Sequence, residues 1–135
     1  MMRTFLLSLA LAFPLAAATA TAEAAELKVV SVSSATLRAG PGPRFPVVAT
    51  IPAGAPLVLH GCVAGYDWCD ISSGADRGWL AAGSLSTIYR AAPVAITAAT
   101  AARIGVAIVA FDRGYWHRYY IGRPWYRRWR WYWRW

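Results

Sequence analysis

Closely spaced turn residues divide positions 26–90 into short apolar runs, and this spacing limits the possible folds more than any other feature. The runs occupy 27–32, 47–51, 57–59, 68–71, 78–80 and 85–89, and the first contains several β-branched residues. Gly-, Pro- and Ser-rich turns separate most of them, at 40–43, 52–54, 72–74 and 82–84. No run keeps helical spacing beyond one turn. The pattern predicts an all-β fold of five to six short strands. So short a segment can bury a hydrophobic core by curling one sheet into a small barrel.

The apolar positions of these runs predict a core. We expect it to contain Leu37, Val47, Ile51, Val58, Ile71 and Leu80. In the loop Gly40-Pro41-Gly42-Pro43, the two glycines are expected to adopt backbone angles that other residues resist, and the prolines to stiffen the loop.

Several short motifs occur in a characteristic order along the same region. They are ATLRAGPG at 35–42, FPVV at 45–48, IPAG at 51–54, Trp68-Cys69, RGWL at 77–80 and Leu85. In order and spacing they resemble a bacterial SH3-like (SH3b) domain over residues 27–89, although Thr36 replaces the usual Asn and Leu80 a common Val. The resemblance implies an SH3-like barrel, which we assign to residues 26–90, and an exported protein that binds cell-wall peptides or peptidoglycan.

The N-terminus predicts export. Residues 1–24 combine Arg3, an apolar stretch from Phe5 to Ala18 and the small residues of Ala22-Glu23-Ala24, which together are typical of a secretory signal peptide cleaved before Ala25. An uncleaved membrane anchor is the alternative, but the apolar stretch is shorter than the roughly 20 residues that a span needs. We therefore expect a secreted protein of the periplasm or cell envelope.

Export changes the interpretation of the two cysteines, because thiols outside the cytoplasm tend to pair. Cys62 and Cys69 flank a segment that contains the turn former Gly65, so a hairpin could join them in a disulfide. The alternative is a metal site with His60 and Asp70 as further ligands. The spacing does not match the paired short spacings of zinc sites, so we expect a disulfide and no metal.

The net charge of +8 is concentrated at the C-terminus. Residues 26–90 carry five cationic and four acidic side chains, whereas residues 111–135 carry seven arginines, one aspartate and 12 of the 19 aromatic residues. Between them, residues 91–110 are rich in Ala and predict an apolar linker, whose second half, 104–111, would add a strand or pack on the barrel. A membrane span there is disfavoured by the central Arg103.

The Arg- and aromatic-rich tail, residues 111–135, resembles the endings of some exported SH3-like proteins. Its composition suits contact with an anionic membrane surface or lipopolysaccharide. Candidate contact residues are Trp125, Arg127, Arg128, Trp129, Arg130 and Trp131. The alternative is an ordered aromatic layer against the barrel with the arginines outward. Nucleic acid is not an expected partner of an exported chain, although Trp and Arg could bind it.

Little in the sequence indicates catalysis. The histidines are His60 and His117, no nucleotide-binding fingerprint occurs, and Asp67, Asp70 and Asp76 lie near turns, where we expect them to cap or to be solvated. The sequence predicts a protein that is not an enzyme and needs no cofactor.

A binding role fits the residues better. We expect ligand contacts from Arg38, Tyr66, Trp68 and Trp79, which could combine aromatic stacking with recognition of a carboxylate. Trp79 could instead belong to the core, and Trp68 could pack over the disulfide. The sequence thus predicts a non-catalytic envelope module that binds peptidoglycan through its barrel, the alternative being a surface-associated structural protein acting through its tail.

Overall fold

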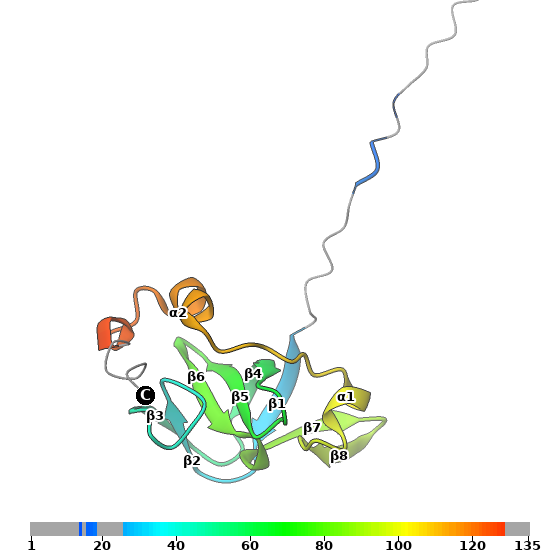
Figure 1. Ribbon diagram of the computed structural model, residues 1–135. Helices are drawn as coiled ribbons and strands as arrows, with labels where there is room; N and C mark the ends of the chain where they lie inside the picture. Colours follow the sequence, from blue (N-terminus) through cyan, green and yellow to red (C-terminus); the bar gives the residue numbers. More distant parts are fainter. Residues whose placement is uncertain (1–13, 15, 19–25, 129–135) are drawn as a thin grey trace, which may run out of the picture.

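The computed structural model describes residues 14, 16–18 and 26–128, and one antiparallel sheet of eight strands dominates it (Figure 1). The strands are β1 (Leu27–Ser31), β2 (Ala35–Arg38), β3 (Val47–Ile51), β4 (Pro56–Cys62), β5 (Trp68–Ser73), β6 (Asp76–Ala81), β7 (Leu85–Tyr89) and β8 (Ala92–Ala95). They are ordered β3-β2-β6-β5-β4-β1-β7-β8. Short helical elements complete the chain: η1 (Ala82–Ser84), α1 (Ala101–Ile104), α2 (Arg113–Tyr120) and η2 (Tyr126–Arg128).

The predicted all-β fold is confirmed, with two more strands than expected. The six predicted apolar runs all fall within or overlap strands. Strand β2 has four residues and β8 lies in the Ala-rich segment that we expected to be a linker. Most of the predicted signal peptide lies outside the described residues.

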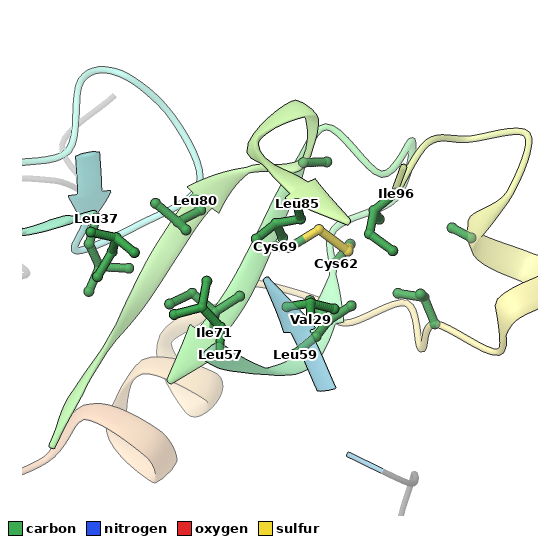
Figure 2. Close-up of a cluster of buried hydrophobic side chains, with 14 residues drawn as sticks. Val29, Leu37, Leu57, Leu59, Cys62, Cys69, Ile71, Leu80, Leu85 and Ile96 are labelled. Carbon is green, nitrogen blue, oxygen red and sulfur yellow. A yellow bond between two sulfur atoms is a disulfide. The ribbon is translucent and has the colours of Figure 1, made fainter. Parts of the chain in front are cut away.

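The core lies on one face of the bent sheet (Figure 2). Four of the six predicted core residues, Leu37, Ile51, Ile71 and Leu80, are buried there. Cys62 and Cys69 lie in the same cluster, where their side chains form the predicted disulfide. The turn between them contains Gly65 at φ 89°, as expected of a residue that permits left-handed backbone angles.

Two core predictions are wrong, because alternation along β4 turns one side chain to the other face and a register shift in β3 displaces the other. In β4, Leu57 and Leu59 point into the core, so Val58 between them points outward and is only partly buried. Val47 begins β3, where the register with β2 shifts, and it is 55% exposed.

The glycines of the 40–43 loop also serve a different purpose from the one predicted. Neither Gly40 nor Gly42 has a positive φ. A Cβ added to Gly40 would lie 2.5 Å from the nearest atom of the Phe45 ring, so this glycine allows close packing of that ring.

The segment after β8 returns to the barrel. Ile108 forms a parallel bridge with Cys62, with hydrogen bonds from Cys62 N to Ala107 O and from Val109 N to Cys62 O. Gly61 permits this approach, because a Cβ there would lie 2.6 Å from Val109 Cγ1. The expected packing of residues 104–111 on the barrel is thus observed. In the described part of the chain, no helix is long and apolar enough to cross a membrane.

Candidate functional site

The face of the sheet opposite the core, here called the outer face, is divided into two halves. Alternation along β5 and β6 turns Asp70, Arg77 and Trp79 to this face, while Cys69 and Leu80 point to the core. The C-terminal tail covers the outer face over β5 and β6, with α2 lying above these strands (Figure 1). Over β4, β1 and β7 the described residues leave a groove open.

A buried ionic cluster fastens the tail to the covered half. Asp70 has no exposed surface, and it accepts bonds from Arg77 Nε, at 3.2 and 3.3 Å, and from Arg77 Nη2, at 2.8 Å. The Tyr115 hydroxyl of α2 donates to the same carboxylate. Burial, followed by the Asp70 charge, raises the pKa of Tyr115, so its hydroxyl stays protonated and available as a donor.

The Asp70 interaction overturns the expectation that this residue caps or is solvated beside a turn. A buried carboxylate needs a charged partner and several donors, and Arg77 and Tyr115 supply them. The sequence held one signal for it: an acid in the middle of an apolar strand, with an arginine in the next strand.

Aromatic packing extends the attachment. Trp79, Tyr115, Trp116 and Tyr120 are buried in one cluster, and Phe111 meets Trp79 edge to face at 5.3 Å. Asp112 caps α2 by accepting a bond from Tyr115 N at 2.8 Å. The described part of the tail therefore forms an ordered aromatic layer on the barrel, which was one of the two alternatives for this segment.

The four predicted ligand contacts do not form one groove. Trp79 is fully buried beneath the tail, so its ring belongs to the core of this layer and not to an exposed site. Arg38 Nη1 donates to Pro43 O at 3.0 Å and to Phe45 O at 2.8 Å, which braces the 40–45 loop. Tyr66 packs partly against the main core, whereas Trp68 packs against the outer-face cluster and not over the disulfide.

The predicted tail contacts lie in different environments. Trp125 is half-buried, with ring centroids 5.1 Å from Trp116 and 5.0 Å from Tyr120. Arg127 is exposed and Arg128 ends η2. Trp129, Arg130 and Trp131 lie outside the described residues.

The open half of the outer face forms a groove of about 580 Å³. Val30 and Ile88, which are 43% and 69% exposed, belong to its lining, and Lys28 is its charged side chain. Its full lining is Leu27, Lys28, Val29, Val30, Pro56, Leu57, Val58, Ser86, Thr87 and Ile88. The groove lies on the rigid centre of the sheet, because β1 pairs with both β4 and β7. We call it the β1 groove.

A polar row crosses the sheet between the β1 groove and the covered half. His60 Nε2 lies 2.6 Å from Ser72 Oγ, and His60 Nδ1 lies 3.7 Å from a carboxylate oxygen of Glu26. Burial, and then the nearby Arg77, lowers the pKa of His60, so the imidazole is neutral at pH 7. Sequence reasoning did not place Glu26 or Ser72 in this cluster.

The metal alternative for His60, Cys62, Cys69 and Asp70 has no support, because the cysteines are joined and Asp70 binds Arg77. Among residues 14, 16–18 and 26–128, no group of three or more His, Cys, Asp or Glu side chains is arranged to hold a metal ion.

Comparison with known families decides what the barrel is. Residues 33–86 match the family model described as the bacterial SH3 domain. The chain contains a bacterial SH3 domain. The match runs from just before β2 into β7, so β1, β8 and the tail lie outside the matched residues. No curated protein and no solved structure matches the chain. The disulfide and the bacterial SH3 domain together indicate a location outside the cytoplasm.

Proposed function

We propose that this protein is an exported, non-catalytic binding module of the cell envelope that recognises peptidoglycan or its peptides through the SH3 domain and β1. Bacterial SH3 domains commonly bind the cell wall. The β1 groove is the observation that carries the proposal, since it is an open apolar depression on the rigid sheet that the described part of the tail, up to residue 128, leaves uncovered.

The chemistry of the β1 groove suits a peptide with small aliphatic side chains and free carboxylates, such as the stem peptides of peptidoglycan. Val30, Val58 and Ile88 offer apolar contact area, and the exposed Lys28 can meet a carboxylate. The hydroxyls of the lining are already committed, as Ser86 donates to Val94 O and Thr87 to Lys28 O. Apolar contacts and one ionic contact would therefore dominate the binding.

Retention on purified peptidoglycan tests this function. Ile88→Asp places a charge in the groove at a side chain that is already exposed, so the fold should survive and retention should fall at least tenfold. Lys28→Gln should lower it by a smaller factor and reduce its salt dependence. The matched control is Ile121→Asp, a similarly exposed isoleucine of the tail outside the groove. If Ile88→Asp and Ile121→Asp are retained like the unmodified protein, the groove is not the binding surface.

Export and the absence of catalysis are part of the same proposal. Residues 1–24 would be removed, leaving a chain that begins at Ala25. Intact mass measured on protein from the periplasm checks this, and a chain that still begins at Met1 would contradict it.

A second function, contact of the tail with an anionic envelope surface, is favoured by the distribution of charge on the tail. Tyr115, Trp116 and Tyr120 are buried in the aromatic layer, whereas Arg118 and Arg127 are exposed. Such arginines attract anionic head groups. Sedimentation with vesicles of phosphatidylglycerol should fall for Arg118→Gln combined with Arg127→Gln, and equal binding to neutral vesicles would exclude this function.

A further inference from the structure

A second cavity lies where the tail meets the barrel. Its volume is about 240 Å³, and it is lined by Pro46, Val47, Val48, Asp76, Arg77, Arg123, Pro124 and Trp125. These residues come from the start of β3, from the beginning of β6 and from the loop after α2. None of them lines the β1 groove. We call it the junction pocket.

The junction pocket contains a cationic and an anionic side chain whose hydrogen-bonding atoms are not all used within the described residues. Arg123 Nη1 donates to Ala75 O, and its other N–H groups have no hydrogen-bond partner among the described residues. The exposed Asp76 carboxylate likewise has no hydrogen bond or ion pair within the part of the chain that the structure describes. Arg77 differs, because Nε and Nη2 are bound to Asp70, which neutralises its charge. Arg123 and Asp76 are therefore the groups that can bind a ligand by charge.

The remaining walls of the junction pocket are apolar and held in place. The Trp125 ring is fixed by Trp116 and Tyr120, and the Arg123 side chain is tied to the turn before β6. Pro46 and Pro124 restrict the backbone on two sides. A pocket whose side chains are already ordered loses little entropy when it binds a ligand.

We propose that the junction pocket binds a small zwitterion of about dipeptide size, its carboxylate on Arg123 and its ammonium group on Asp76. A guanidinium binds a carboxylate through paired N–H groups, and a carboxylate is the natural partner of an ammonium group. The volume lies just below the range of about 300–1,000 Å³ that drug-sized ligands occupy, which limits the ligand to a small one. This inference goes beyond the proposed function, because it concerns a different surface and needs the tail.

Titration of the purified protein with alanylalanine tests the proposal by two-dimensional ¹⁵N NMR. Saturable shifts are expected at the Arg123 Nε–H and the Trp125 indole N–H. The C-terminal amide and the N-acetyl form of the dipeptide each remove one charge, and each should bind about tenfold more weakly. Failure of alanylalanine to give saturable shifts, or equal binding of all three compounds, overturns the proposal.

Two substitutions assign the ends of the ligand. Asp76→Asn should remove the preference for the free amine and keep the preference for the free carboxylate, and Arg123→Gln should do the reverse. Arg90→Gln, at the exposed turn between β7 and β8, is the matched control and should change neither preference. If Arg123→Gln shifts the Tyr115 signals, the tail has moved, and the result for Asp76→Asn alone tests the proposal. An unchanged preference for the free amine in Asp76→Asn overturns the proposal.

The source of the zwitterion is resolved by comparing two measurements on Asp76→Asn. Weaker dipeptide binding with unchanged retention on peptidoglycan identifies a soluble peptide. Weaker binding in both identifies free peptide ends of the wall. Ile88→Asp, in contrast, should leave dipeptide binding unchanged, so failure of the junction pocket and failure of the proposed function give different results.

Discussion

Tyr115→Phe tests whether the buried ionic cluster holds the tail on the barrel. The substitution removes a single hydroxyl and keeps the ring in the aromatic layer. The lost bond is one to a fully buried carboxylate, and hydrogen bonds to charged groups contribute about 1.5–3 kcal/mol. Arg77 still pairs with Asp70 in the variant, so the cost should stay near 2 kcal/mol and below the 3–5 kcal/mol or so of a broken buried ion pair.

Tyr119→Phe is the matched control for this prediction. Tyr119 lies on the same helix, is partly exposed, and its hydroxyl makes no hydrogen bond to the described residues. The free energy of unfolding, from urea titration followed by far-ultraviolet circular dichroism, should fall by about 2 kcal/mol for Tyr115→Phe and by less than about 0.5 kcal/mol for Tyr119→Phe. For a domain of this size, the first change lowers Tm by roughly 10 °C.

Two results would refute the reasoning. The first is an equal loss of unfolding free energy in the two variants, which would mean that the hydroxyl of Tyr115 stabilises the fold no more than the hydroxyl of Tyr119 does. The second is a large loss for Tyr115→Phe without faster amide exchange in α2, which would place the damage away from the tail.

Three further predictions concern stability. Replacing Cys62 and Cys69 together by Ala should lower the free energy of unfolding by about 2.5 kcal/mol, because a short loop in the unfolded chain is no longer closed; unchanged urea midpoints would contradict this. Since the folded pKa of His60 is below its unfolded value, the unfolded state takes up the proton first, and stability should fall as pH drops below about 6.5; His60→Gln should flatten that dependence. Burial raises the pKa values of Tyr115 and Tyr120, so above about pH 10 the unfolded state loses protons first. The free energy of unfolding should then fall by up to about 1.4 kcal/mol per pH unit for each group. Tyr120→Phe should remove about half of this slope, and an unchanged slope would show that Tyr120 is not buried.

The barrel could be predicted from sequence because its signals are local. Alternating apolar residues such as Leu37 and Ile51, together with Gly- and Pro-rich turns, mark the strands, and Cys62 and Cys69 flank a turn that brings them together. The errors arise where local signals carry too little information. Val58 is as apolar as Leu57 and Leu59, so composition cannot tell which face each takes. The alternation along β4 decides it, once Leu57 and Leu59 point to the core.

The candidate sites were harder to predict, because each combines residues that are distant in sequence. Asp70 and Tyr115 are 45 positions apart, and no short motif joins them. The β1 groove brings Lys28 beside Ile88 through the pairing of β1 with β7. The predicted contacts Arg38 and Trp79 are neighbours across β2 and β6, but the tail buries Trp79. The sequence thus predicted an exposed binding site at Trp79, whereas the tail covers this side chain.

The placement of the tail has a consequence for the design of functional assays. Asp70 and Arg77 belong to the residues that match the bacterial SH3 domain, whereas Tyr115 belongs to the tail. A fragment that ends at residue 90 would expose Trp79 and leave Asp70 without one of its donors, creating an apolar patch that the intact protein does not have. Such a fragment could adhere to peptidoglycan or to vesicles through that patch. Single substitutions in the full chain, such as Ile88→Asp and Asp76→Asn, keep the tail in place and therefore report on the β1 groove and the junction pocket separately.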